Sequence, residues 1–142
     1  MRTVFLLLLT TLTLTAAERP LFRDLVGING HTVAFKPELY KPVCGVVRDY
    51  HPVKWDLADD TSKLPDWPFA KNKVSWEQVY GSWNKAGLRI SVCFQFDEMK
   101  DQWKDLAKDA HAYAKGFAQN FGPGGKWPFV EWIELGNEPG LY

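Results

Sequence analysis

Short apolar runs alternate with helix-like segments along most of the chain, and this alternation restricts the fold more than any other feature. The apolar runs cover residues 25–30, 44–49, 88–95 and 129–136. Each has the length of a buried strand and is followed by turn-forming or polar residues. Strands separated by helices are typical of a parallel sheet joined by right-handed crossovers. We therefore expect an α/β fold with four parallel strands in sequence order.

The segments between the apolar runs contain helix signals. Ser75 begins a capping box, Ser-Trp-Glu-Gln, which predicts a helix that starts there and stops at Gly87. Apolar residues between 103 and 121 recur at spacings of three, one and four, which predicts a second amphipathic helix. Asp49 and Asp97, at the ends of two apolar runs, are either acids at the rim of the sheet or helix caps, and we favour caps.

Polar residues close every apolar run, and the carboxyl ends of parallel strands meet at one edge of a sheet. These residues are His31, then Arg48, Asp49 and His51, then Gln95 and Asp97, then Asn137 and Glu138. In a (β/α)8 (TIM) barrel the active site is built at that edge, and a whole barrel takes about 250 residues. We therefore predict that residues 18–142 are the N-terminal half of such a barrel, about four βα units, and a fragment of a longer domain.

The first residues are predicted to be a signal peptide, residues 1–17, that takes no part in the fold. Arg2 precedes an apolar run over residues 4–14, and residues 15–17 supply the small side chains of a cleavage site. The run is shorter than the roughly 20 residues that span a bilayer. We expect a mature start at Glu18, a secreted or periplasmic protein, and no membrane association after cleavage.

The charge and the aromatic content limit the kinds of molecule that this protein is expected to bind. Seventeen basic and 17 acidic residues leave no net charge to attract nucleic acid or an anionic membrane. Aromatic residues make up 15% of the chain, and they either fill the core or stack on sugar rings. Residues 52–74 show no sustained periodicity and predict a long loop, on which Trp55 and Trp67 are candidates for sugar stacking. Trp83 and Trp103 lie on helix stripes, where we expect core packing.

The segment from Trp132 to Pro139, Trp-Ile-Glu-Leu-Gly-Asn-Glu-Pro, resembles the fourth-strand motif of the clan A glycoside hydrolases. These retaining (β/α)8 enzymes include families five, ten, thirty-nine and fifty-one, and the motif here is nearest to the last two. Arg48, after the second run, is similar to the arginine that recurs on the second strand of that superfamily. The resemblance implies hydrolysis of O-glycosidic bonds in a polysaccharide or oligosaccharide by a retaining mechanism, without a cofactor.

The same resemblance assigns the catalytic roles. It makes Glu138 the general acid/base and Asn137 a donor to the sugar 2-hydroxyl, in a site whose two carboxyls lie about 5–5.5 Å apart. The nucleophile would be a glutamate on the seventh strand, beyond Tyr142. We therefore expect the isolated chain to be inactive and its partner to be the missing C-terminal half of the barrel. The alternatives are a non-catalytic secreted carbohydrate-binding protein and an inactive fragment.

Several other polar residues have two interpretations. Glu134 should point into the barrel interior, where a buried carboxylate needs a partner, and Arg48 is the nearest candidate. His31 and His51 either contact substrate or form hydrogen bonds at the rim or in the core, and neither has metal-ligand spacing. Candidate substrate-binding residues are thus Asn137, Arg48, His31, His51 and Trp55, and no metal site is predicted.

Two cysteines in an exported chain could form a disulfide. Cys44 lies at the start of the second apolar run, and Cys93 lies near the end of the third. A bridge needs Cα atoms within about 7 Å, and this stagger exceeds it. We expect two buried free thiols.

Overall fold

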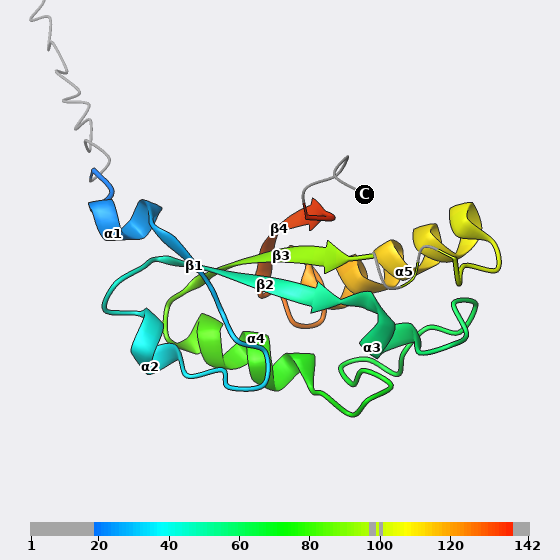
Figure 1. The fold of residues 1–142 in the computed structure, drawn as a ribbon. Coiled ribbons are helices and arrows are strands. Elements are labelled where there is room, and N and C mark those ends of the chain that lie inside the picture. The colour runs from blue at the N-terminus through cyan, green and yellow to red at the C-terminus, as the bar shows by residue number, and fades with distance from the viewer. Residues whose placement is uncertain (1–18, 97–98, 100, 138–142) are drawn as a thin grey trace, which may run out of the picture.

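The computed structural model describes residues 19–96, 99 and 101–137 (Figure 1). Four features predicted from the sequence lie outside these residues: the signal peptide over residues 1–17, the mature start at Glu18, the cap Asp97 and the acid/base Glu138.

A four-stranded sheet forms the centre of the fold (Figure 1). Its strands are β1 (Gly27–Asn29), β2 (Val46–Pro52), β3 (Arg89–Gln95) and β4 (Val130–Leu135). They lie in the order β1-β2-β3-β4, and each neighbouring pair is parallel. The prediction of an α/β fold with four parallel strands in sequence order is confirmed. This arrangement is compatible with part of a barrel.

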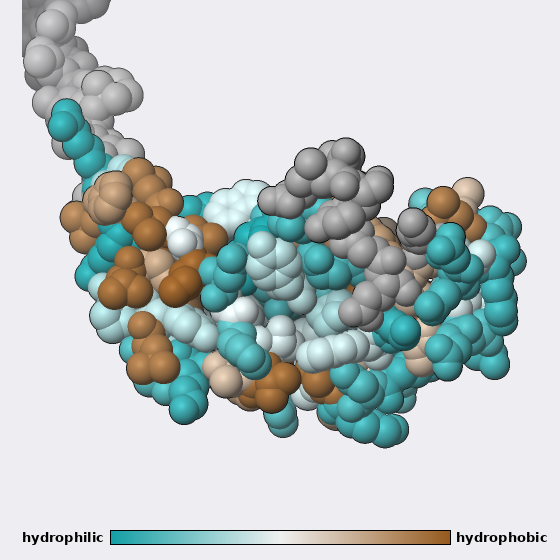
Figure 2. All heavy atoms as spheres, viewed as in Figure 1, coloured by the Kyte–Doolittle hydropathy of each residue, from teal (hydrophilic) through white to brown (hydrophobic). Residues whose placement is uncertain are grey.

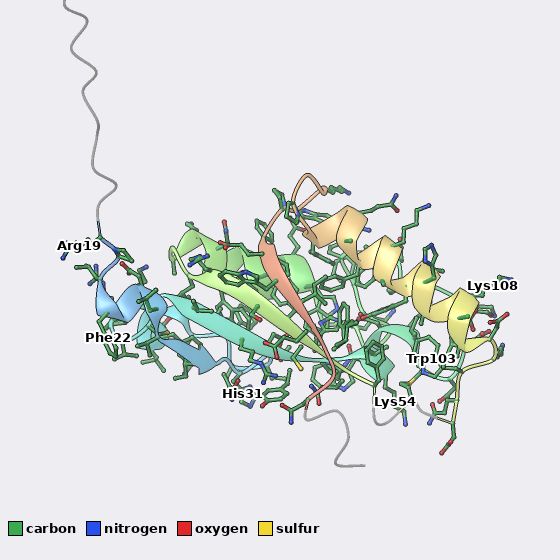
Figure 3. All side chains as sticks on the ribbon, turned by 90° about the horizontal axis from the view of Figure 1, so that it is seen from above. Arg19, Phe22, His31, Lys54, Trp103 and Lys108 are labelled. Carbon is green, nitrogen blue, oxygen red and sulfur yellow. The ribbon has the colours of Figure 1, made fainter. Side chains whose placement is uncertain are left out.

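Five helices accompany the strands in the residues that the structure describes. They are α1 (Phe22–Leu25), α2 (Pro37–Tyr40), α3 (Val53–Leu57), α4 (Trp76–Lys85) and α5 (Leu106–Phe121). The two long ones, α4 and α5, follow β2 and β3 in the chain and cover the same face of the sheet (Figures 1 and 3). In the described part of the chain, the search for helices of sufficient length and hydrophobicity to cross a membrane found none.

The ends of α4 and α5 follow from capping side chains. Ser75 Oγ accepts a hydrogen bond from the Gln78 backbone N–H at 3.3 Å, and Gly87 has a φ of +77°, so the predicted start and stop of α4 are confirmed. The second helix begins later than the spacing predicts. Asp105 accepts from the Lys108 N–H at 3.1 Å and caps α5, which leaves Trp103 before the helix (Figure 3).

Residues 52–74 are not a loop throughout, because α3 begins directly after β2. The indole of Trp55 stacks on Trp76, with ring centroids 6.4 Å apart. Trp67 packs edge-on against Phe117 and Phe121, at 5.7 and 5.4 Å. These contacts favour core filling over sugar stacking for both tryptophans.

The core lies between the sheet and the two long helices. Buried residues of the sheet include Val47, Ile90, Val92 and Phe94, and the helices supply Trp83, Tyr113, Phe117 and Phe121. Because side chains alternate along a strand, the strand residues next to these buried ones point to the opposite face of the sheet. That face carries Arg48, Tyr50, Ser91 and Glu134, whose side chains are joined by hydrogen bonds and ring contacts.

The two cysteines are free and buried. Cys93 is in register with Tyr50 on β2, whereas Cys44 precedes β2. The offset of six residues is about 20 Å at 3.3 Å per residue. The predicted stagger is confirmed, and burial raises the pKa of both thiols.

Both outer strands of the described sheet have exposed apolar neighbours. Around β1 these are Leu21, Phe22, Leu25, Leu39 and Val43, and Figure 2 shows hydrophobic atoms gathered over α1 and α2. Beside β4 is an apolar cleft of about 500 Å³, lined by residues that include Phe96, Trp103, Leu106 and Leu135. The Leu135 side chain is 72% exposed. Apolar surface is thus exposed at both edges of the described sheet.

Gly30, just after β1, allows close packing that a larger residue would prevent. A Cβ atom there would lie 2.5 Å from Val47 Cγ2 and 2.8 Å from the Trp83 ring. We expect Gly30→Ala to lower the free energy of unfolding by about 1–3 kcal/mol because the ring and strand must shift. Urea unfolding followed by tryptophan fluorescence measures this.

The matched control is Gly81→Ala on α4, where a Cβ would meet the Phe129 ring at an ordinary 3.5 Å. We expect it to be neutral or to stabilise by about 0.5–1 kcal/mol, since alanine favours a helix more than glycine does. Equal effects of the two substitutions would contradict the packing argument for Gly30.

Candidate functional site

The candidate site lies on the sheet face opposite α4 and α5, between β2 and the carboxyl end of β4. Arg48 is the third residue of β2, so it lies within the strand and not at its end as the sequence predicted. The centre of the site is an ion pair between Arg48 and Glu134. Arg48 Nε donates to Glu134 Oε1 at 2.9 Å, and Nη2 donates to Oε2 at 2.6 Å. This two-pronged geometry is the one that guanidinium and carboxylate groups prefer. The predicted pairing of Glu134 with Arg48 is confirmed.

The surroundings of Glu134 keep its carboxylate ionised. Hydrogen bonds from Arg48 lower the pKa of Glu134, and Ser91 Oγ donates a further bond to Oε1 at 3.0 Å. Both oxygens are therefore occupied by donors. A carboxylate held in this way orients its neighbours and is poorly suited to exchange protons, which favours the structural role for Glu134.

Asn137 lies two residues after β4 and faces the ion pair. Arg48 Nη2 and the Tyr50 hydroxyl each donate to Asn137 Oδ1 at 3.4 Å. Two donors on the amide oxygen turn the NH2 group of the side chain away from Arg48. The sequence-predicted Arg48 and Asn137 are thus brought together.

The same sheet face carries a shallow cavity of about 440 Å³ that runs from β1 to β4. Asn29, Arg48, Ser91, Trp132 and Glu134 are among the residues that line it. Trp132, which is 40% exposed, lines the cavity together with the polar groups of Arg48, Ser91 and Glu134. The cavity gives the ion pair access to solvent and to a small ligand.

His31 lies at the rim, two residues after β1 (Figure 3). Its Nδ1 accepts hydrogen bonds from the backbone N–H groups of Val33 and Ala34, at 3.2 and 3.0 Å. Its own backbone N–H donates to the Tyr40 hydroxyl at 3.2 Å. The imidazole therefore holds the turn after β1, and its exposed position is compatible with either interpretation of this residue.

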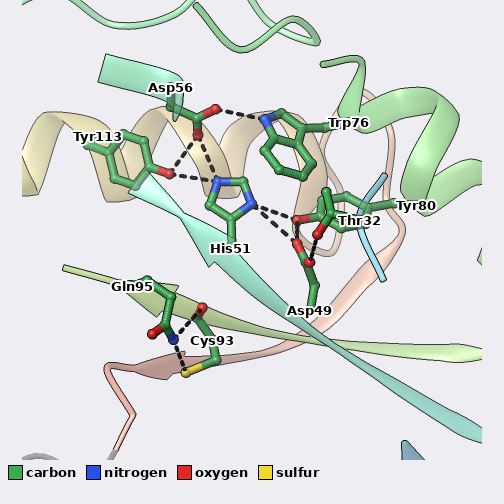
Figure 4. Close-up of polar contacts among 9 residues, drawn as sticks. All are labelled: Thr32, Asp49, His51, Asp56, Trp76, Tyr80, Cys93, Gln95 and Tyr113. Atoms are coloured by element: carbon green, nitrogen blue, oxygen red, sulfur yellow. Dashed lines mark hydrogen bonds and ion pairs between the residues drawn. The ribbon is translucent and has the colours of Figure 1, made fainter. Parts of the chain in front are cut away.

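His51 lies on the opposite face of β2 from Arg48, completely buried between the sheet and the helices (Figure 4). Its Nδ1 lies 2.7 Å from the Tyr80 hydroxyl, and its Nε2 lies 2.7 Å from Asp56 Oδ2 and 2.9 Å from the Tyr113 hydroxyl. A ring with no exposed surface and three partners is a core residue. Its position favours that interpretation over substrate contact.

Asp49 belongs to the same buried network, and the prediction that it caps a helix is wrong. It lies within β2, and its side chain points toward α4. There Oδ2 accepts from the Tyr80 hydroxyl and Oδ1 accepts from Thr32 Oγ1, both at 2.7 Å (Figure 4). The Asp56 carboxylate likewise accepts two hydrogen bonds, from Trp76 Nε1 and from the Tyr113 hydroxyl, both at 2.7 Å.

His51 is charged within this network. Burial alone would lower its pKa, but the carboxylates of Asp56 and Asp49 outweigh that effect and raise the pKa of His51 to about 9. Burial also raises the pKa values of Tyr80 and Tyr113 far above their usual range, so both phenols remain donors. Each phenol accepts from the imidazolium and donates to a carboxylate, so the donors and acceptors match.

Within residues 19–96, 99 and 101–137, no three or more His, Cys, Asp or Glu side chains lie in a group that could hold a metal ion. Comparisons of the chain with known protein families, curated proteins and solved structures found no match. The functional interpretation therefore rests on the residues at the strand ends.

Sequence reasoning missed Tyr50 and Ser91 as members of the site. Tyr50 lies two residues after Arg48, and Ser91 is in register with Arg48 on β3. The period of two along a strand would have placed Tyr50 on the same face as Arg48. The contact with Ser91 depends on strand register, for which the sequence carries no local signal.

The charged state of His51 makes stability depend on pH. The folded pKa of about 9 exceeds the ordinary 6.5, so this contribution is complete below pH 6.5 and is lost as pH rises through 9. The difference corresponds to on the order of 3 kcal/mol. We expect urea midpoints to fall between pH 7 and 10 in the unmodified chain and to fall less in His51→Gln. Parallel pH profiles for the two proteins would contradict a charged His51.

Proposed function

We propose that this chain is the acid/base half of a retaining (β/α)8 glycoside hydrolase that cleaves O-glycosidic bonds in a polysaccharide or oligosaccharide. The observation that carries the proposal is the orientation of Asn137 by Arg48. Asn137 directly precedes Glu138 in the sequence, at the carboxyl end of β4. An amide whose oxygen is held by other donors keeps its NH2 group available, and this suits recognition of a sugar hydroxyl next to the bond that is cleaved.

The chemistry assigns a separate task to each group. Glu138 would protonate the leaving glycosidic oxygen and then deprotonate the incoming water. Asn137 Nδ2 would donate to the 2-hydroxyl, a contact that strengthens as the sugar becomes oxocarbenium-like. Glu134 is held ionised by Arg48 and Ser91 and would take no part in proton transfer. Arg48 would place Asn137 and balance the charge of Glu134.

The nucleophilic carboxylate is expected from the other half of the barrel. Exposed apolar side chains at both edges of the sheet support this part of the proposal, since four further βα units would cover them. Closing the barrel would also surround the cavity that Arg48 and Trp132 line. A carbohydrate is then the expected ligand, and export to a secreted or periplasmic location is the expected setting.

The test is a Glu138→Gln substitution in the chain joined to the complementary half of the barrel. We expect the rate of cleavage to fall by about 10²–10⁴-fold because an amide cannot protonate the leaving group. The loss should be smallest for activated aryl glycosides, whose leaving groups need little protonation. Azide should partly restore the activity of Glu138→Ala by attacking the glycosyl-enzyme without base assistance.

The matched control is Glu131→Gln, which changes an exposed glutamate on β4 that pairs with Arg89. It should leave the rates unchanged. An equal loss in Glu138→Gln for good and poor leaving groups would remove Glu138 from the acid role. Sugar binding without any hydrolysis by the completed protein would instead favour a non-catalytic carbohydrate-binding protein.

A further inference from the structure

Tyr50 is a candidate that the proposed mechanism does not use. It lies on β2 two residues after Arg48, and 37% of it is exposed on the site face. The Arg48 guanidinium carbon lies 4.4 Å above the centre of its ring. Its hydroxyl reaches Asn137 Oδ1 at 3.4 Å. Tyr50 therefore contacts both Arg48 and Asn137, to which the proposed function assigns roles.

We propose that Tyr50 is a positioning residue that fixes the side-chain amide of Asn137 as a donor toward the substrate. The inference rests on the proposed function. The side-chain amide of an asparagine can rotate by 180°. The oxygen, an acceptor, and the NH2 group, which carries two donors, then exchange places while the side chain keeps almost the same shape. Turned in that way, Asn137 would present its oxygen to the sugar and its NH2 group to Arg48, which has no acceptor.

Arg48 by itself holds this orientation through one long contact. Its Nε and Nη2 atoms are already bound to Glu134 at 2.6–3.0 Å, and its contact with Asn137 is longer, at 3.4 Å. The Tyr50 hydroxyl adds a second donor to the same oxygen from another direction. Such contacts are often long in a ligand-free site and tighten when the substrate binds.

The position of Tyr50 is fixed from both faces of its strand. On the site face its ring lies against Arg48. On the opposite face its two neighbours, Asp49 and His51, are held in the buried network. Strand β2 also pairs with β1 and β3. Tyr50 is thus a rigid support for Asn137, which follows the outer strand β4.

A direct test is Tyr50→Phe in the full chain, which keeps the ring above Arg48 and removes the hydroxyl. We expect the side-chain amide signals of Asn137 in a ¹⁵N-labelled sample to shift and broaden. Asn137→Asp assigns these signals by their loss. The matched control is Tyr40→Phe, whose hydroxyl bonds to the His31 backbone away from Asn137. Unchanged Asn137 signals in Tyr50→Phe would overturn the proposal.

A second readout uses the completed enzyme and pairs of substrates with and without a 2-hydroxyl. Tyr50→Phe should lower kcat/KM for the 2-hydroxy substrate about tenfold more than for its 2-deoxy counterpart. A residue with a merely structural role would lower both equally, and that result would also overturn the proposal. Lack of hydrolysis by the unmodified enzyme would count against the proposed function, while the NMR measurement would still decide the role of Tyr50.

Discussion

A buried imidazolium between two carboxylates is the interaction on which the rest of the structure depends. His51 and its partners join β2 to α3 through Asp56, to α4 through Tyr80 and to α5 through Tyr113. Removing one partner from such a group typically lowers the free energy of unfolding by about 3–5 kcal/mol, because a charge is left buried and unpaired. The elements on the covered side of the sheet are therefore held in one arrangement. Strand β2 then has a fixed register, and its alternate residues meet the site at fixed positions.

The charged side chains on the two faces of β2 are stabilised in different ways. On the covered face, His51 is charged because Asp49 and Asp56 compensate for the loss of water. On the site face, the Arg48–Glu134 pair remains partly exposed and is supported by Ser91. The first arrangement holds the helices against the sheet. The second holds β4 against β2 across β3, and its arginine also contacts Asn137, two residues after β4.

Much of the fold could be predicted because its signals are local. The apolar runs, the Ser75 cap and the Gly87 stop each depend on a few neighbouring residues. The Arg48–Glu134 pair could be predicted because a carboxylate that points inward needs a partner of opposite charge. Helix α3 was missed since five residues are too few to show a helical period. The buried network joins residues as far apart in sequence as His51 and Tyr113, and neither spacing nor composition indicates such a contact. Assigning Asp49 as a cap failed for the same reason.

The outer strand β4 also bears on how the protein behaves at high concentration. A strand at the edge of a sheet can add a strand from another molecule, which leads to aggregation. Here the register shifts between β3 and β4 near Ile90, and the exposed apolar residues Trp132 and Ile133 lie between two acidic ones, Glu131 and Glu134. Both glutamates are paired with arginines of the neighbouring strands, Glu131 with Arg89 and Glu134 with Arg48, so the irregular backbone is the feature that makes this edge a poor template for an identical one. Strand β4 can thus stay open to a strand of complementary shape while resisting self-association.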